Sequence, residues 1–360
     1  MLPVDKILMG ETVEVLKTFP DECIDVIFAD PPYFMQTDKK TLQRADGTGK
    51  FKGCDDSWDK YSGYEEYDEF SIAWLKECKR VLKPNGTIWV IGSFQNIYRL
   101  GYIMQNLDFW ILNDIIWSKI NPTPNMSGTR FCNAHETLLW CAKSNKSKFT
   151  FNYKTMKALN NEKQDKSVWN LGICQGNERL KDDNGRKLHN TQKPLQLLEK
   201  IILSSTKPND IVLDPFFGTG TTGVAAKKYN RRFIGIEREP KYVSGAQNRI
   251  DAQKDCSNIY SNLTLEIKPP KVPIKKLIES GLLVENETLF DKNGKVAGTL
   301  TSDGDAIYNN EKFSIHKLSA KLLNKSNHNG WDYFFVKRDS DLVSINDFRY
   351  IYSSRKKEII

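Results

Sequence analysis

The chain has 360 residues, of which 39% are hydrophobic and 27% are charged, and its formal net charge is +8. This composition is that of a soluble globular protein, and the length exceeds that of a single minimal module, so we expect two domains. No apolar run approaches the roughly 18 residues that a membrane span requires. The aspartate in the N-terminal MLPVDKILMG disfavours a signal peptide. We therefore expect a cytoplasmic protein without membrane association.

The seven cysteines and four histidines show none of the paired spacings found in disulfide frameworks or metal sites. No two cysteines form a CxxC pair, and no two histidines form an HxxxH or HExxH pair. The sequence therefore predicts reduced thiols and no bound metal.

The first third of the chain predicts a parallel sheet. Residues 24–29 (IDVIFA) form a short apolar, β-branched run that ends at the rigid turn 30–33 (DPPY). Apolar positions recur at helical spacing over 66–82, and after KPNG the run 87–93 (TIWVIGS) is again typical of a buried strand. A strand, a helix and a second strand in this order are typical of parallel pairing.

The same alternation returns late in the chain. Residues 194–206 predict a helix, 209–216 a strand, 220–230 a helix and 231–237 a strand. Together the two halves predict a doubly wound, Rossmann-like α/β domain, which we place at 1–262.

Residues 120–190 separate the two halves and lack clean periodicity. Between residues 143 and 200, 13 Lys and Arg stand against 6 Asp and Glu, a local net charge of +7. Such an excess is typical either of a solvated face or of a surface that attracts nucleic-acid phosphates. We expect a loop-rich target-recognition insertion in this stretch rather than sheet core.

A domain boundary is predicted where KPPKVP carries three prolines in six positions, which makes a semi-rigid spacer. We assign 263–273 to this linker and 274–360 to a small α+β C-terminal domain. In that domain short strand-like runs alternate with the turn sequences DKNG and SDGD, and 314–324 predicts a helix.

A glycine-rich loop carries the first chemical signal. Residues 218–223 (GTGTTG) match the pattern GxGxxG, and Glu237 ends the next predicted strand. Taken alone, this favours a dinucleotide site and hence a nicotinamide-dependent dehydrogenase. Asp214 stands just before the loop, where an acid repels a pyrophosphate but suits the ammonium group of an amino-acid-like cofactor.

The turn 30–33 carries the second signal, at the strand end where open α/β sheets bind ligands. On structural grounds alone it is a strand terminator. Chemically, the Asp30 carboxylate and the Pro31 carbonyl are acceptors for both N–H groups of an exocyclic amino group. Tyr33 is suited to stack on a base swung out of the duplex.

Together, DPPY and DPFFGTGTT resemble the motifs of the S-adenosylmethionine-dependent amino-methyltransferases of DNA. Their order, with DPPY first, is that of the β group of these enzymes. The resemblance implies a Rossmann-like methyltransferase fold, S-adenosylmethionine as cofactor and double-stranded DNA as partner. It places Asp30, Pro31, Pro32 and Tyr33 at the catalytic centre. It implies cofactor contacts for Glu11, Thr191, Lys193, Ser204, Asp214, Phe216, Gly218, Gly220 and Glu237.

The resemblance narrows further. The acid that opens DPPY resembles the adenine-N6 enzymes more than the cytosine-N4 enzymes, which often have serine, and cytosine N4 stays the alternative target. Segments along the chain, among them GTRFCNAHETLLW and NHNGWDYFF, resemble the HinfI-type adenine methyltransferases, relatives of the cell-cycle-regulated methyltransferase. This implies the site GANTC and a C-terminal module associated with DNA binding. A cognate restriction endonuclease acting separately and a homodimer are both compatible with it.

Four residues are candidates for DNA contact. Arg130 lies in the insertion, and a guanidinium suits the paired acceptors of guanine or a phosphate. The C-terminal candidates are Ser314, Asn329 and Trp331, the last of which is equally typical of a domain core. We interpret His135-Glu136 as structural or DNA-positioning rather than as a catalytic pair. A DNA-binding module with relict methylase motifs is the non-enzymatic alternative.

Overall fold

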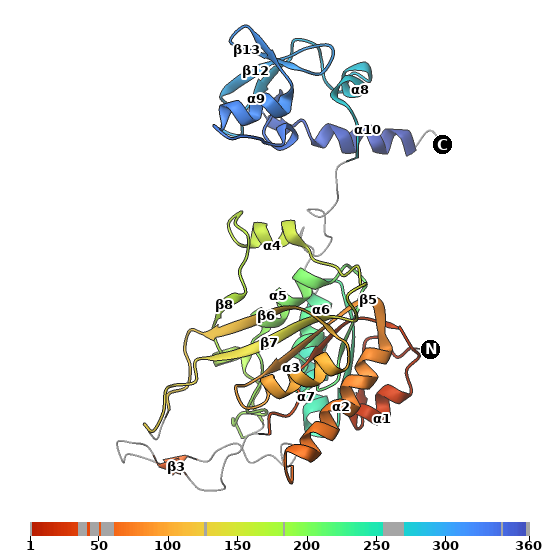
Figure 1. The fold of residues 1–360 in the computed structure, drawn as a ribbon, viewed down its shortest axis with the longest axis vertical. Helices are drawn as coiled ribbons and strands as arrows, with labels where there is room; N and C mark the ends of the chain where they lie inside the picture. Colours follow the sequence, from red (N-terminus) through yellow and green to blue (C-terminus); the bar gives the residue numbers. More distant parts are fainter. Residues whose placement is uncertain are drawn as a thin grey trace. The chain divides into compact units, whose positions relative to one another are not determined.

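The protein forms two compact units, residues 1–266 and 267–360 (Figure 1). The division falls within the linker expected at 263–273, of which 263–269 lie outside the described residues. Among the described residues, no helix is both long and apolar enough to cross a membrane. The computed structural model describes residues 2–34, 42–43, 50–51, 61–125, 128–182, 184–254, 270–339 and 341–357.

The first unit is built on an eight-stranded sheet with the order β1-β10-β9-β2-β5-β7-β6-β8. In that order the strands are Lys6–Met9, Arg232–Glu237, Ile211–Asp214, Ile24–Ala29, Leu82–Gly92, His135–Ala142, Trp110–Lys119 and Val168–Leu171. The strands from β1 to β5 pair in parallel, whereas β7 runs antiparallel to both of its neighbours. At the far edge β8 pairs in parallel with β6.

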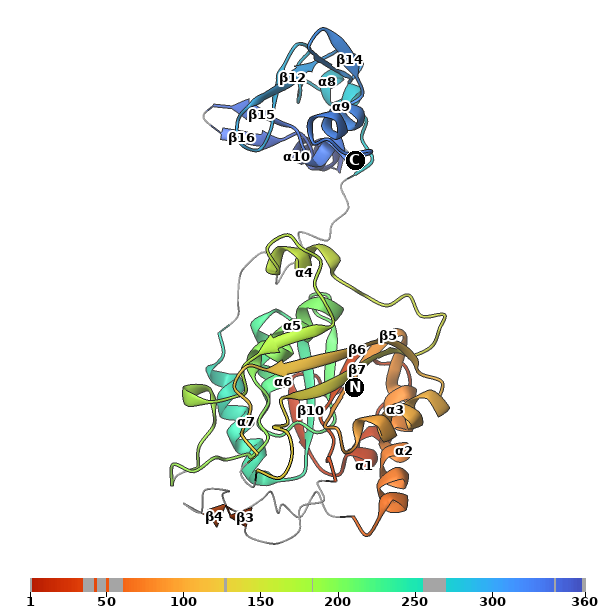
Figure 2. The same cartoon turned by 60° about the vertical axis from the view of Figure 1, so that its left-hand side comes forward.

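Helices cover both faces of this sheet, because successive apolar residues of a buried strand point to opposite sides. In β2, Val26 and Phe28 belong to one core cluster, whereas Ile27 and Ala29 belong to the other. The first cluster includes residues of α5 (Leu195–Ser205), α6 (Thr221–Lys228) and α7 (Pro240–Ala252). The second includes residues of α1 (Thr12–Lys17), α2 (Tyr64–Val81) and α3 (Ile97–Asn106). The doubly wound α/β prediction is confirmed (Figure 2).

Two local predictions are wrong. KPNG does not separate α2 from a strand, because β5 starts at Leu82 directly after the helix and includes these residues. The stretch 120–190 is not free of sheet core, because β7 lies between β5 and β6 and is buried from Leu138 to Ala142. Its sequence HETLLWCA is too short for a periodicity signal to separate a buried strand from a buried helix. The same stretch also holds α4 (Tyr153–Leu159) and a 3₁₀ turn at Gly176–Glu178.

The second unit is an antiparallel sheet of six short strands with helices, in the order β14-β13-β12-β11-β15-β16. The strands are Glu311–Phe313, Ala306–Tyr308, Val296–Leu300, Thr288–Phe290, Phe335–Arg338 and Asp341–Ser344. Its helices are α8 (Ile274–Glu279), α9 (Ile315–Leu322) and α10 (Asp347–Lys357), and a 3₁₀ turn spans Gly330–Asp332. Fully buried Leu277, Leu289 and Phe334 contribute to its separate core.

The remaining described strands belong to the first part of the chain, where β3 (Leu42–Gln43) and β4 (Lys50–Phe51) form a two-stranded sheet.

Candidate active site

A pocket lies where two neighbouring parallel strands end. β2 pairs with β9 through Val26 with Val212 and Ile27 with Leu213, so their carboxyl ends meet at one edge of the sheet. Asp30 follows β2 directly and Asp214 is the last residue of β9. The pocket encloses about 1060 Å³, including space open to solvent. Of the residues named from the sequence, it is lined by Glu11, Asp30, Pro31, Pro32, Tyr33, Thr191, Lys193, Asp214, Phe216, Gly218 and Glu237.

Asp214 forms one end of this pocket and is only 3% exposed. Its carboxylate accepts hydrogen bonds from the Thr222 hydroxyl at 2.5 Å and from the Phe216 N–H at 3.0 Å. Among the described side chains, no lysine or arginine forms an ion pair with it. Burial raises the pKa of Asp214 to about 7 despite these two hydrogen bonds. A buried carboxylate without a cationic partner is suited to an incoming ammonium group.

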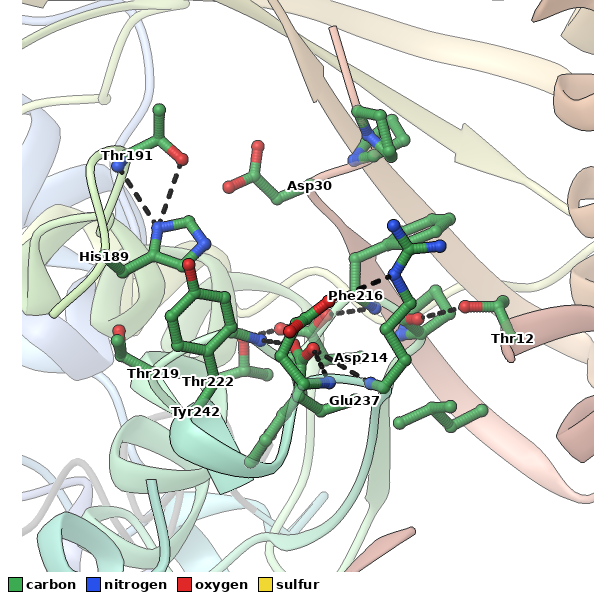
Figure 3. Close-up of a pocket in the computed structure, with 18 of the residues that line it drawn as sticks. Thr12, Asp30, His189, Thr191, Asp214, Phe216, Thr219, Thr222, Glu237 and Tyr242 are labelled. Atoms are coloured by element: carbon green, nitrogen blue, oxygen red, sulfur yellow. Dashed lines mark hydrogen bonds and ion pairs between the residues drawn. The ribbon is translucent and has the colours of Figure 1, made fainter. Parts of the chain in front are cut away.

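Glu237 ends β10 and is oriented by the backbone. One carboxylate oxygen accepts the Gly218 N–H at 2.7 Å, and the other accepts the N–H groups of Arg238 and Glu239 at 2.9 Å each. Two carboxylate oxygens offer about four lone-pair positions, so about one position remains for a hydroxyl donor from the pocket. Figure 3 shows Glu237 beside Asp214 and Phe216, with Asp30 facing the same space.

The glycine loop turns the chain from β9 into α6. Gly218 and Gly220 both have positive φ, at 52° and 73°. A Cβ on Gly220 would lie 2.8 Å from the Cβ of Ala246, so this glycine allows α6 and α7 to approach closely. Gly220 shapes the loop and does not itself line the pocket.

The other end of the pocket is held by ion pairs between side chains. The Lys193 ammonium lies 2.6 Å from the Asp30 carboxylate, and it also donates to the Thr191 carbonyl at 3.3 Å. Burial raises the pKa of Asp30, and Lys193 opposes this effect. Tyr33 is 7% exposed, and Lys193 lies 5.2 Å from the centre of its ring. Burial, followed by the nearby carboxylates, raises the pKa of Tyr33 well above its ordinary value, so the phenol stays protonated.

The chain is similar in sequence to known DNA methylases. The profile of the DNA methylase family matches residues 24–248. The chain is 60% identical over 352 residues to the Type II methyltransferase M.HinfI of Haemophilus influenzae, which is 98% of each chain. It is 43% identical over 249 residues to the Type II methyltransferase M2.DpnII of Streptococcus pneumoniae, covering 69% of this chain and 90% of that one.

The chain belongs to the N6/N4 DNA methylase family.

Two solved structures are similar to this chain. The M1.HpyAVI-SAM complex matches with a TM-score of 0.50 and 30% identity, covering 68% of this chain and 98% of that one. The cytosine-N4-specific PvuII DNA methyltransferase shares the fold with a TM-score of 0.53 at 22% identity, covering 72% of this chain and 89% of that one. The resemblance to the HinfI-type enzymes is confirmed. The enzyme is a DNA methyltransferase that uses S-adenosylmethionine, and the dehydrogenase alternative falls away.

The hydrogen-bond acceptors that line the pocket of this methylase fit that cofactor. At one end Asp214 is suited to an amino-acid ammonium group, and about one strand away Glu237 is suited to ribose hydroxyls. Phe216 lies beside the two acids and packs against Trp74, with the ring planes perpendicular and the ring centres 5.2 Å apart. An apolar wall beside two acids matches a ligand with a zwitterionic end, a ribose and a purine.

Besides Gly220, two further residues named from the family resemblance are placed differently from the rest. Ser204 is 2% exposed in α5, its hydroxyl donates to the Ile201 carbonyl at 3.0 Å, and it does not line the pocket. Lys193 lines the pocket but contacts Asp30 rather than Asp214. Its side chain therefore lies at the Asp30 end of the pocket.

Several side chains of the site were not found from the sequence. The Thr12 hydroxyl donates to the Pro215 carbonyl at 2.6 Å and fixes the start of the glycine loop, although 203 positions separate them. Tyr242 also lies beside the loop, where its ring packs against that of His189, a residue of the family-like segment HNTQKP, with ring centres 4.6 Å apart. Of the missed residues only Thr222 had a signal, since it lies in the same glycine-rich segment as Gly220. Glu136, dismissed as a catalytic residue, contacts Tyr33.

The candidates for DNA contact lie outside the pocket. Arg130 is exposed in the loop between β6 and β7, with its guanidinium 5.6 Å from the Phe94 ring centre. In the second unit, Ser314 caps α9 by accepting the Lys317 N–H at 3.3 Å. The Asn329 amide donates to Asp332 at 2.7 Å. Trp331 is half-buried against the core of that unit and has the Arg349 guanidinium 4.4 Å from its ring centre.

Proposed function

We propose that this enzyme transfers the methyl group of S-adenosylmethionine to N6 of adenine in double-stranded DNA, with GANTC as its site. One observation carries the proposal: Asp30 and Asp214 lie at the ends of adjacent parallel strands and line a single pocket. An amino-group acceptor and an ammonium acceptor are thereby held at the two ends of one site.

The base-binding end supplies the acceptors that the reaction needs. An exocyclic amino nitrogen is a poor nucleophile, because its lone pair is delocalised into the ring. Hydrogen bonds from both of its N–H groups to the Asp30 carboxylate and the Pro31 carbonyl localise that pair toward the methyl donor. Tyr33 provides an aromatic wall against which a flipped base stacks.

The cofactor, when bound, supplies an electrophilic methyl group whose bond to sulfur breaks as the bond to nitrogen forms, leaving a neutral thioether. The nitrogen becomes positively charged in this step and then loses a proton, for which Asp30 is the nearest carboxylate. Asp214 would hold the ammonium group, Glu237 the ribose hydroxyls and Glu11 the adenine edge. The Glu11 carboxylate itself accepts a hydrogen bond from Arg238 at 3.1 Å. Placement in line is sufficient, and no covalent enzyme intermediate is required.

Target reading is proposed to be shared between the insertion and the second unit. The insertion carries the basic excess and the exposed Arg130. In the second unit, the Trp331 ring is partly exposed, and Ser314 and Asn329 are the polar candidates. Truncation after Pro273 tests this division, because unit 1 has its own core and keeps the whole pocket. We expect cofactor binding to survive and DNA affinity and its salt dependence to fall.

Cytosine N4 is the second candidate target, because the matched family covers both N6 and N4 enzymes. Nucleoside mass spectrometry of DNA incubated with enzyme and labelled cofactor separates the two products. Exclusive N6-methyladenine within GANTC supports the proposal. N4-methylcytosine as the product would show that the target base is cytosine. Adenine methylation in another sequence would overturn the recognition site GANTC but not the N6 chemistry. Absence of methyl incorporation would support the non-enzymatic DNA-binding alternative.

We further propose that the enzyme acts in the cytoplasm and protects DNA against a separate restriction endonuclease. Support comes from its similarity to two Type II methyltransferases. DNA modified to completion by this enzyme should resist an endonuclease specific for GANTC, whereas unmodified DNA should be cut.

A further inference from the structure

Glu136 is a buried acid beside the base-binding end of the site. It lies on β7 opposite Trp117 of β6, and Lys119 follows Trp117 two positions later on the same face of the sheet. The side chains of Lys119 and Glu136 are only 14% and 12% exposed. Two charged groups this deeply buried are stable only when their hydrogen bonds are satisfied by each other or by neighbours.

Both oxygens of the Glu136 carboxylate are engaged. Oε1 lies 2.7 Å from the Lys119 ammonium, and Oε2 accepts the Tyr33 hydroxyl at 3.0 Å. The Lys193 ammonium lies 3.9 Å from Oε2, against 2.6 Å from Asp30. Burial alone would raise the pKa of Glu136, but Lys193 and Lys119 outweigh it and hold the pKa below its usual range. The group is therefore a carboxylate at neutral pH.

We propose that Glu136 is a positioning residue for methyl transfer, holding the Tyr33 ring in its stacking plane while Lys119 balances its charge. The inference rests on the proposed function and adds a residue outside the DPPY motif to it.

The role of Lys119 follows from the charges. Asp30 and Glu136 are two carboxylates that both lie near Lys193. Without Lys119, Glu136 would compete with Asp30 for that single ammonium group. With Lys119 bound to Glu136, Lys193 stays on Asp30, and the four charges sum to zero around the Tyr33 ring. The arrangement orients the base-binding carboxylate and the stacking ring together.

The hydroxyl of Tyr33 is the link between Glu136 and the base. A phenol ring has two soft torsions, and a hydrogen bond at its far end restricts both. Loss of that bond leaves the ring in the site but widens the range of planes it adopts. Since in-line transfer is sensitive to displacements of about 1 Å, turnover should fall while the cofactor pocket stays intact.

Three variants test this: Glu136→Ala, Glu136→Gln and Tyr33→Phe, together with the Glu136→Ala/Tyr33→Phe double variant. The measurements are single-turnover methyl transfer, cofactor affinity by calorimetry, and fluorescence of 2-aminopurine placed at the target adenine. Glu199→Ala is the matched control. Glu199 is a partly buried acid whose carboxylate lies 2.5 Å from the Lys228 ammonium, and neither residue lines the pocket.

We expect Glu136→Ala to lower the methyl-transfer rate about 10- to 100-fold with little change in cofactor affinity. Glu136→Gln should recover part of that loss, because its amide oxygen still accepts the Tyr33 hydroxyl. The double variant should lose less than the two single losses combined, since both changes break the Tyr33–Glu136 bond, while Tyr33→Phe also removes the interaction of the hydroxyl with Asp30. The 2-aminopurine signal should rise in Glu136→Ala, reporting a flipped base that is less well stacked.

Wild-type rates in Glu136→Ala would overturn the inference, as would additive losses in the double variant or an equal loss in Glu199→Ala. If Glu136→Ala does not fold, Glu136→Gln and Tyr33→Phe decide, since each removes one feature without opening a cavity. If the wild-type protein fails to methylate adenine in DNA, the proposed function itself fails. If the wild type is active and the variants are equally active, only the role of Glu136 fails.

Discussion

The two ends of the pocket are built by different means. At the cofactor end, Asp214 and Glu237 are oriented largely by backbone N–H groups one to two positions away, with Gly218 adding one from 19 positions away. At the base-binding end, Asp30 is held by Lys193 across 163 positions, and Tyr33 by Glu136 across 103. One end is organised by local turns and the other by side chains that only the folded sheet brings together.

This difference determines how far a substitution should spread. A change at the cofactor end removes one ligand contact and leaves the turn in place. A change at the base-binding end also releases a charged neighbour, because Asp30, Lys193, Glu136 and Lys119 form a continuous chain of ion pairs. Substitutions at the cofactor end should therefore change mainly cofactor affinity, and substitutions at the base-binding end should change mainly the methyl-transfer rate.

Asp30→Asn should have the largest effect, a loss of methyl-transfer rate on the order of 10²- to 10³-fold. The amide retains an acceptor but loses the charge that localises the lone pair of the amino nitrogen. Cofactor affinity should change less than the rate, because Asp30 acts on the ammonium site only through the charge repulsion that helps to raise the pKa of Asp214. Single-turnover kinetics and calorimetry check the two halves of this statement, and wild-type turnover would remove Asp30 from the catalytic centre.

Asp214→Ala should weaken cofactor binding by about 1.5–3 kcal/mol, roughly 10- to 100-fold, which is the range for a hydrogen bond to a charged group. The methyl-transfer rate at saturating cofactor should change less than the affinity. Isothermal titration with S-adenosylmethionine measures the loss. Unchanged affinity would move the ammonium site elsewhere in the pocket.

Cofactor affinity should depend on pH through the same residue. The pKa of Asp214 is about 7, so below that value the carboxyl is neutral and cannot pair with an ammonium group. Affinity should rise as the carboxyl ionises around pH 7 and fall by up to about tenfold per unit below it, with a proton released on binding in the acidic range. Asp214→Asn should flatten this profile. A wild-type affinity that is constant from pH 5.5 to 8 would contradict the assignment.

Ser204→Ala should have the smallest effect, leaving cofactor affinity nearly unchanged. Its hydroxyl bonds the Ile201 carbonyl within α5 and does not reach the pocket. Thr222→Val is the contrasting variant, because it removes the hydroxyl that donates to Asp214. Calorimetry should show a loss only for Thr222→Val. A substantial loss for Ser204→Ala would restore the cofactor contact that the family resemblance implied.

The sequence placed the residues around Asp214 in the right elements, because the signals of those elements are local. The strand 211–214, the glycine loop and the strand that ends at Glu237 are contiguous apolar and glycine patterns. It also predicted Asp30 at a strand end. It did not predict Glu136 or Lys119 as part of the site, because their relation depends on the antiparallel pairing of β6 with β7. The failure to recognise β7 as a strand and the failure to place Glu136 have the same cause.

The pairing of β2 with β9 also sets the distance between the methyl donor and the methyl acceptor. The two aspartates keep their separation through backbone hydrogen bonds of neighbouring strands, whose spacing is fixed at about 4.8 Å. A slip of one residue would shift one acid by about 3.3 Å and turn alternate side chains to the wrong face. The chain segment that joins the two halves of the domain does not affect this distance. A circularly permuted enzyme with the glycine loop encoded before DPPY should therefore keep the same donor-to-acceptor distance, provided that the new ends lie in exposed loops.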